Sequence, residues 1–133
     1  MGRNPFAPEF KDLPAELPVF PLPNVLLLPS GHLPLNIFEP RYLKMIEDAL
    51  KGSRMIGMIQ PREGGAIYDT GCAGKIVDFT ETGDGRYLIT LNGVCRFKVK
   101  QELNVTTPYR QLKPDWSPFE DDLENTDCLN LNR

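Results

Sequence analysis

The chain has one histidine and three cysteines among its 133 residues, so it contains few of the side chains that catalysis and metal binding require. The histidine, His32, falls in a predicted loop without a partner nearby in the sequence, which argues against a Ser–His–Asp group. Cys72, Cys95 and Cys128 stand 23 and 33 residues apart, a spacing typical of neither a disulfide framework nor a zinc site. We therefore predict no catalytic residue, no metal and no cofactor, and a protein that is not an enzyme.

Long hydrophobic runs are also absent. The longest uninterrupted run covers residues 25–28, whereas a membrane span needs about 20 apolar residues. The first residues lack the apolar core of a secretory signal. The string GCAGKI, residues 71–76, is the nearest approach to a phosphate-binding loop, but its spacing differs from G-x-x-x-x-G-K-[ST]. We predict a cytoplasmic protein that has no membrane partner and does not bind nucleotides.

Neither sign of charge dominates the chain, whose formal net charge is −3 at pH 7. Residues 1–114 hold 14 basic and 12 acidic residues, whereas residues 115–133 hold six acidic residues and one basic residue, Arg133. A protein that binds nucleic acid through its phosphates carries a strongly basic face. We therefore do not expect nucleic acid as a partner, and we describe residues 115–133 as an acidic tail.

Proline, in contrast, is abundant: nine of the 13 prolines precede residue 41. Proline fixes φ and removes a backbone donor, so this third of the chain suits neither the centre of a sheet nor a long helix. We expect a flexible lead-in over residues 1–15, followed by short extended pieces over residues 17–22, 24–31 and 33–38. Such pieces are typical of edge strands and tight connections around a small barrel.

One helix is predicted to begin at Pro40, which suits the first turn because its missing N–H has no partner there anyway. Apolar residues recur at three- and four-residue spacing over residues 42–50, and Gly52 marks the end of the helix. The string RMIGMIQ, residues 54–60, predicts a strand, and Gly57 within it indicates a bulge or a close backbone approach. The helix should therefore pack one apolar face on a core.

Three more strands are predicted over residues 72–82, 86–93 and 94–103, separated by the turn strings GDG and NG as an antiparallel meander. The last strand alternates apolar with basic residues, which predicts one dry and one basic face: Cys95, Phe97 and Val99 against Arg96, Lys98 and Lys100. Residues 108–116 favour a further strand, and a helix could start after residues 117–118. The predicted fold class is mainly β (α+β).

The stretch LPVFPLPNVLLLPSGHLPLNIFEPRYLKMIEDAL, residues 17–50, contains a proline-framed hydrophobic opening, a P-x-G turn and an E-x-R-Y entry into the helix. Together with GCAGKI and LNGVCRFKV, it resembles the N-terminal substrate-binding domain of Lon proteases over about residues 16–102. This resemblance implies a PUA-like, partly open β-barrel with one inserted amphipathic helix over residues 16–114. The positions that match the family's motifs are implied to be structural: Pro29, Gly31, Pro34, Glu39, Arg41, Tyr42, Gly71, Ala73, Ile76, Gly93, Arg96 and Phe97.

The resemblance does not include the catalytic parts of Lon proteases. Neither their AAA+ ATPase module nor their Ser–Lys proteolytic domain can fit in this chain. It is more similar to small bacterial proteins in which the Lon N-terminal domain stands alone. Those proteins continue with a helical extension after the barrel, so residues 115–133 are expected to include the start of one.

The resemblance implies a non-catalytic module that binds unfolded proteins or a partner protein, such as a protease or an ATPase. The string NVLLLP, residues 24–29, indicates where, because three adjacent leucines in a proline-framed loop cannot all face inward. The predicted contact residues are Leu26, Leu27, Leu28 and Phe38. The alternative is that two of the leucines fill the mouth of the barrel.

Two other functions stay open. PUA-like barrels often serve RNA enzymes, so the basic face of residues 94–103, with Arg86 nearby, is an alternative RNA-binding surface, although few aromatic residues accompany it. The barrel could also serve assembly alone. We further hypothesise that the acidic tail docks on the basic strand.

Overall fold

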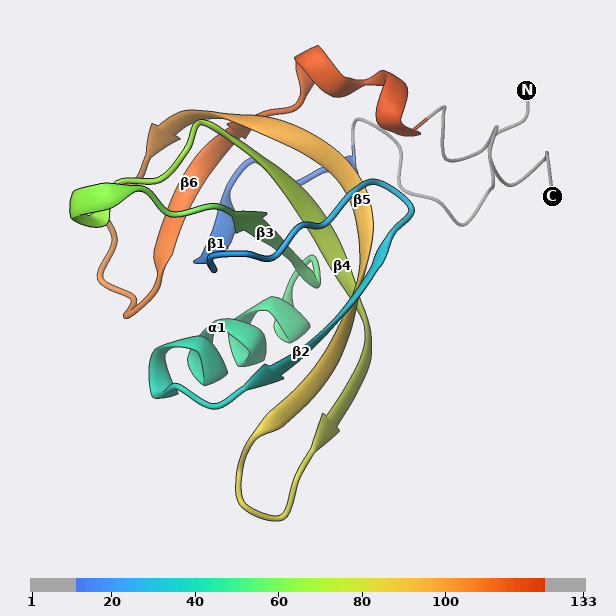
Figure 1. Cartoon of the computed structure of the whole chain (residues 1–133), viewed down its shortest axis with the longest axis vertical. Coiled ribbons are helices and arrows are strands. Elements are labelled where there is room, and N and C mark those ends of the chain that lie inside the picture. The colour runs from blue at the N-terminus through green and yellow to red at the C-terminus, as the bar shows by residue number, and fades with distance from the viewer. Residues whose placement is uncertain (1–11, 124–133) are drawn as a thin grey trace, which may run out of the picture.

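The computed structural model describes residues 12–123, which form six strands and one long helix (Figure 1). In chain order the elements are β1 (Leu17–Pro21), β2 (His32–Ile37), α1 (Pro40–Lys51), β3 (Met55–Ile59), η2 (Glu63–Gly65), β4 (Thr70–Glu81), β5 (Tyr87–Glu102), β6 (Arg110–Asp115) and η3 (Ser117–Phe119), where η is a short 3-10 helix. No helix in this part of the chain is both long and apolar enough to cross a membrane. The predicted fold class, mainly β with one helix, is confirmed.

The six strands form one sheet in the order β2-β5-β4-β3-β1-β6, and β5 also pairs with β6. Five strands therefore follow one another around a partly closed ring, while β2 pairs with the first part of β5 and extends the sheet. Figure 1 shows β4 and β5 as long curved strands that continue from the ring into the extension of the sheet. A mainly β fold with a partly closed ring and one helix is what the resemblance implied.

The predicted meander of three strands over residues 72–103 is wrong. Residues 86–93 and 94–103 belong to the single strand β5, because Asn92 and Gly93 are not a turn but pair with Lys75 and Gly74 of β4. The turn at residues 83–85 is confirmed and lies at the end of a β4–β5 hairpin, where the N–H of Thr82 donates to the carbonyl of Arg86 at 2.9 Å. Gly93 is instead covered by the segment around Leu28 and is hydrogen-bonded to Ser30 and Gly31.

The proline-rich third also departs from the prediction. Residues 24–31 form no strand, and His32 opens β2 instead of lying in a loop. β2 does lie at an edge of the sheet, but β1 pairs with β3 on one side and with β6 on the other. The closing of the ring gives β1 its second neighbour, and a proline pattern carries no information about that closing.

The helix α1 begins and ends where the sequence predicts. Pro40 is its first residue, and the N–H of Gly52 donates to the carbonyl of Ala49 at 3.0 Å just after its end. Its buried stripe, Tyr42, Met45, Ile46 and Ala49, packs in a first core with residues of β2, β3 and the first half of β5. One apolar face on a core is the arrangement that the helical spacing predicted.

A second core fills the ring. Along β3, Met55 and Ile59 face this core, whereas Ile56 and Met58 face the first one, as the alternation of a strand requires. Gly57 lies between them, and a Cβ there would come within 2.8 Å of the Leu17 side chain. The strand prediction is therefore confirmed, but the glycine marks neither a bulge nor a close backbone approach: it makes room for the side chains of Leu17 and Phe97.

The packed part of the chain continues beyond residue 114. Trp116, Phe119 and Leu123 join the second core, and the Trp116 Nε1 donates to the carbonyl of Pro14 at 3.0 Å. The first residues of the acidic tail thus contribute apolar side chains to the interior. Residues 124–133, with Cys128, and residues 1–11 of the predicted lead-in lie outside the described residues.

Two tyrosines attach α1 to the sheet. The hydroxyl of Tyr87 donates to Glu47 and that of Tyr109 donates to Asp48, each at 2.6 Å. Burial, with the hydrogen bond to Asp48, raises the pKa of Tyr109 above its ordinary value, so the hydroxyl stays a donor at neutral pH.

We expect Tyr109→Phe to lower the free energy of unfolding by about 1 kcal/mol, because it removes the hydrogen bond to the charged Asp48 carboxylate. The loss is no larger because water can partly replace the lost donor. Urea unfolding followed by circular dichroism measures the change. Tyr68→Phe is the matched control, because Tyr68 is exposed. Equal stability of the two variants would show that the Tyr109 hydroxyl does not stabilise the helix.

Candidate functional site

Residues 22–31, which we call the strap, cross the face of the sheet between β1 and β2 (Figure 1). One end is held by Gln60, whose side-chain nitrogen donates to the Val25 carbonyl at 2.5 Å and whose side-chain oxygen accepts the N–H of Asn24 at 3.3 Å. At the other end, the N–H of Ser30 donates to the carbonyl of Gly93 at 2.9 Å, and the N–H of Gly93 donates to the Gly31 carbonyl at 2.8 Å. The strap is thus tethered at both ends.

Two glycines make room beneath the strap. Gly74 of β4 and Gly93 of β5 are direct partners in the ladder. A Cβ on Gly74 would lie 2.8 Å from the Leu27 side chain, and one on Gly93 would overlap the backbone carbonyl of Leu28. The absence of side chains at this pair leaves a trench in the sheet surface, and the middle of the strap lies in it.

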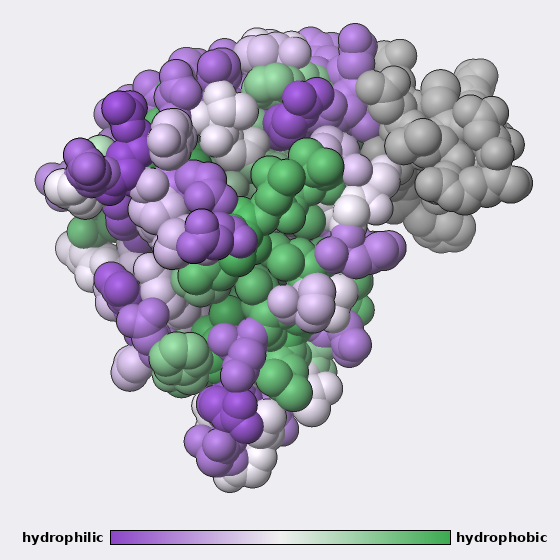
Figure 2. Space-filling model, viewed as in Figure 1, coloured by the Kyte–Doolittle hydropathy of each residue, from purple (hydrophilic) through white to green (hydrophobic). Residues whose placement is uncertain are grey.

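The three strap leucines have different environments. Leu27 is 4% exposed and packs in the first core, whereas Leu26 is 73% and Leu28 is 54% exposed. The alternative that two of them fill the mouth of the barrel is therefore wrong, because only Leu27 points inward. Figure 2 shows hydrophobic residues gathered across the middle of this face, over the strap and the strands behind it.

Of the predicted contact residues, Leu26, Leu28 and Phe38 are exposed, with Phe38 at 64% in the connection between β2 and α1. Leu27 is not accessible, because the glycine trench admits its side chain. The structure therefore brings Leu26 and Leu28 together at one place, whereas Phe38 does not line the same pocket.

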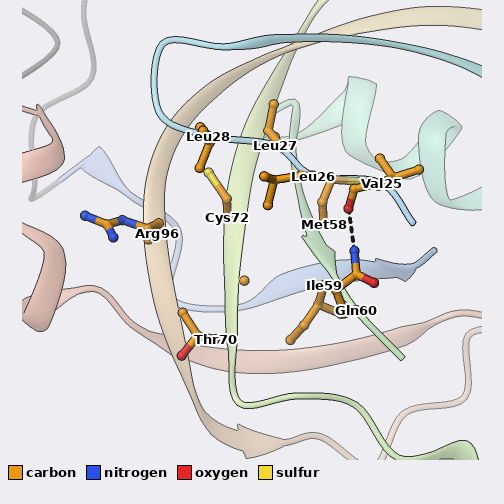
Figure 3. A pocket seen from close by; sticks show the side chains of 11 residues that line it. Val25, Leu26, Leu27, Leu28, Met58, Ile59, Gln60, Thr70, Cys72 and Arg96 are labelled. Atoms are coloured by element: carbon orange, nitrogen blue, oxygen red, sulfur yellow. Dashed lines mark hydrogen bonds between the residues drawn. The ribbon is translucent and has the colours of Figure 1, made fainter. Parts of the chain in front are cut away.

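A groove of about 120 Å³ lies beside the strap (Figure 3). Its floor is a row across three strands, in which Met58 of β3 pairs with Cys72 of β4 and Cys72 pairs with Arg96 of β5. Leu26 and Leu28 form one wall, and Gln60 and Thr70 line the groove farther along the strands. The trench and the groove are thus neighbouring rows of the same sheet surface, and the strap covers only the first.

Arg96 closes one end of the groove with its stem, while its guanidinium points away from the groove (Figure 3). Its Nε and Nη2 donate to the carboxylate of Asp122 at 3.0 and 2.8 Å, and its backbone N–H donates to the same carboxylate at 2.9 Å. The guanidinium also lies 4.6 Å from the centre of the Phe119 ring. The hypothesis that the acidic tail docks on the basic strand is confirmed for this part of the tail.

Asp122 carries this contact from a buried position, since only 2% of it is exposed. Burial acts to raise its pKa, but the hydrogen bonds from the side chain and backbone of Arg96, with the charge of the guanidinium, outweigh burial and hold the pKa below its ordinary value. The carboxylate is therefore ionised at neutral pH and paired with Arg96.

The groove suits binding rather than covalent chemistry. Burial raises the pKa of the Cys72 thiol to about 12, so the nucleophilic thiolate is scarce at neutral pH. Within residues 12–123, no three side chains of the metal-binding types gather at one point. The Nδ1–H of His32 donates to the Oδ1 of Asn92 at 2.5 Å, and neither residue lines the groove.

The basic face of residues 94–103 is balanced by acidic residues. Arg96 pairs with Asp122, the Lys98 ammonium lies 3.9 Å from the Asp69 carboxylate, and the charge of Lys100 contributes to a lowered pKa of Asp115. The hydrogen bonds from Ser117 are the larger cause of that last shift. The row therefore offers little uncompensated positive charge to a phosphate backbone.

The structure places the positions that match the family's motifs in several environments, and their structural role stays a prediction. Pro29 and Gly31 lie in the last part of the strap, and Gly93 is hydrogen-bonded to that part. Pro34 lies on β2, Glu39, Arg41 and Tyr42 lie at the entry to α1, and Ala73, Ile76 and Phe97 are core residues. Gly71 and Arg96 differ, because both line the groove.

The floor of the groove could not be predicted from the sequence. Met58, Cys72 and Arg96 are up to 38 residues apart, and they meet only through the register of β3, β4 and β5. The alternation within each strand shows which residues share a face, but not which residue of one strand lies opposite which residue of the next.

Comparison with known proteins identifies the family. Residues 16–129 match the model of a protein family that is described as the ATP-dependent protease La (LON) substrate-binding domain. The Lon protease of Anaeromyxobacter dehalogenans is 33% identical over 106 residues, which are 74% of this chain and 12% of that protein. The Lon protease of Roseiflexus castenholzii is 34% identical over 108 residues, or 77% of this chain and 13% of that protein. This chain thus spans a small part of the length of these relatives.

Solved structures agree with the sequence relatives. A Lon N-terminal domain protein from Xanthomonas campestris superposes with a TM-score of 0.66 at 29% identity, covering 76% of this chain and 59% of that one. The N-terminal domain of a Mycobacterium avium complex Lon protease has the same fold, with a TM-score of 0.64 at 15% identity over 76% of this chain and 54% of that one. The match over most of the chain and the shared fold lead to one conclusion: this protein belongs to the LON substrate-binding domain family.

Proposed function

We propose that this chain is a non-catalytic recognition module that binds extended apolar segments of other proteins in the groove beside the strap. The observation that carries the proposal is the exposure of Leu26 and Leu28 on a backbone tethered at both ends, next to the apolar floor made by Met58 and Cys72. Exposed apolar surface of this kind, rimmed by polar residues, marks a site of protein interaction.

The tethered backbone favours binding because the groove exists before the ligand arrives. Gln60 holds one end of the strap, Gly93 holds the other, and Leu27 packs in the core between them. Little conformational freedom then has to be lost in the strap when a segment binds, which is a general source of affinity. The groove thus combines an apolar surface with a fixed shape.

The description of the matching family supports the same function, since it names a substrate-binding domain. The ligands in this proposal are unfolded proteins or a partner protein, which could be a protease or an ATPase. The proposal also places the protein in the cytoplasm. The RNA-binding alternative gains no support from the basic face, because its basic residues have acidic neighbours.

The test is the binding of a fluorescent, reduced and alkylated protein that stays unfolded, measured by anisotropy. We expect Leu28→Asp to weaken binding at least tenfold, because it places a charge where an apolar segment would lie. Leu88→Asp is the matched control: Leu88 is also exposed, at 42%, but it does not line the groove. Both variants should unfold at the temperature of the wild type.

If Leu28→Asp bound the unfolded protein with wild-type affinity, the groove would not be the binding site. A second variant, Phe38→Asp, decides whether the binding surface extends toward α1, because Phe38 is exposed but lies outside the groove. Loss of binding in Phe38→Asp alone would move the site to the connection between β2 and α1.

A further inference from the structure

The size of the groove limits what can enter it. Its volume is about 120 Å³. An engineered protein cavity of about 150 Å³ is known to hold one benzene molecule. The groove can therefore hold the side chain of a leucine, isoleucine or methionine, whereas an indole ring would fill it and extend through its open side into solvent.

Packed elements fix that size. The two floor residues Met58 and Cys72 are each 4% exposed. At Gly71, a Cβ would lie 2.6 Å from the Met58 carbonyl and 2.8 Å from the Phe97 ring, so the space beneath this residue is already filled. The strap on the other side is tethered at both ends. Because protein interiors are close-packed, widening the groove requires movement of the core or of the strap.

The chemistry of the lining excludes charged side chains. The guanidinium of Arg96 points away from the groove and is paired with Asp122, so only the Arg96 stem faces a ligand (Figure 3). The side-chain amide of Gln60 is bonded to the strap backbone through both its oxygen and its nitrogen. A charged group in the groove would lose water without meeting an opposite charge, which is unfavourable.

From size and lining together we infer that the groove selects one unbranched or branched aliphatic side chain, of leucine or methionine size, on an extended segment. This inference rests on the proposed function and narrows it to a class of ligand. The aliphatic side chain lies between Leu26 and Leu28 on one side and the Met58–Cys72 pair on the other. A tryptophan at this position leaves part of its ring in solvent and binds more weakly, and segments that present a charge at this position are rejected.

The test uses peptides of glycine and serine that carry a single variable residue, Ala, Leu, Met, Trp or Asp, added to the protein labelled with ¹³C at its methionine methyl groups. Met58 is the reporter in the groove, and the buried Met45 and Met55, which do not line the groove, are internal controls. We expect the Leu and Met peptides to shift the Met58 signal with affinities at least tenfold higher than those of the Ala, Trp and Asp peptides.

Filling the groove provides the matched variant. Cys72→Val adds volume at the floor and should weaken the Leu peptide about tenfold while leaving the Ala peptide unchanged, since only the larger side chain reaches Cys72. A melting curve of the variant shows whether it folds. If Cys72→Val does not fold, the peptide series on the wild type still decides the inference.

The outcomes separate the inference from the proposed function. Binding of the unfolded protein together with equal affinity for the Leu and Trp peptides, or with no Met58 shift by any peptide, would overturn the selection of an aliphatic side chain and leave the recognition module in place. Failure of the unfolded protein and of every peptide to bind would overturn both.

Discussion

Gly93→Ala is expected to lower the free energy of unfolding by about 3 kcal/mol and to abolish binding in the groove. A Cβ at this position would overlap the backbone carbonyl of Leu28, and backbone atoms cannot move aside as the end of a flexible side chain can. The strap would have to leave the trench, withdrawing Leu27 from the first core. Removal of a buried leucine from a core destabilises by about 2–5 kcal/mol.

Thermal and urea unfolding measure this effect, and a loss of about 3 kcal/mol should lower Tm by roughly 10 °C or more in a domain of this size. Gly83→Ala is the control, because a Cβ there would meet no atom within 4 Å. It should leave Tm and binding unchanged. If Gly93→Ala melts together with Gly83→Ala, the strap does not lie in the trench as described.

Asp122→Asn is expected to lower the free energy of unfolding by about 2 kcal/mol at pH 7. The buried carboxylate accepts three hydrogen bonds from Arg96, and the amide keeps the shape but neither the charge nor the second acceptor oxygen. A hydrogen bond to a charged group contributes about 1.5–3 kcal/mol, and we take the lower part of that range because the Arg96 side chain is 45% exposed.

The stabilisation by the Asp122–Arg96 pair should depend on pH in a predictable direction. Since the pKa of Asp122 in the folded protein lies below its unfolded value of about 3.9, its stabilisation is complete above that value and is lost as the pH falls through the folded pKa. We expect the wild type to lose more stability than Asp122→Asn between pH 5 and about pH 2. Urea unfolding at several pH values measures the difference.

The control for the Arg96–Asp122 pair is a second arginine–carboxylate pair, which has the same two-bond geometry but is not buried. Arg110 donates through Nε and Nη2 to both oxygens of Glu102, at 2.8 and 2.7 Å, but both side chains are partly exposed. Exposed ion pairs contribute about 0–1 kcal/mol, so Glu102→Gln should change stability at pH 7 by less than Asp122→Asn. Equal effects of the two variants would show that the burial of Asp122 adds nothing to the pair.

Much of the local structure could be predicted from the sequence because its causes are local. Pro40 and Gly52 bound the helix, the spacing of its apolar residues gives the buried stripe, and the turn at residues 83–85 closes the hairpin. Strands β3 and β6 also fall where their patterns place them. The motifs of the substrate-binding domain were sufficient to predict the family and the partly open ring.

The predictions failed where a residue serves a distant segment. Gly93 has the sequence pattern of a turn, but it is a glycine because Leu28 crosses above it. Leu27 resembles its two exposed neighbours, but it lies above Gly74 and is therefore buried. No pattern within a strand contains this information, since the crossing segment comes from another part of the chain.

The sequence by itself thus determined the family, the elements and the face that each element turns to a core, because propensity, capping and alternation act over a few residues. The sequence also indicated Leu26 and Leu28 as contact residues, but only the tertiary structure decided the rest of the candidate site. The pairing of Met58 with Cys72 and of Cys72 with Arg96, the position of the strap beside that row, and the reach of Asp122 to Arg96 all depend on strand register and ring closure. Register is set by the packing of the whole sheet, so the groove exists only once the ring has closed.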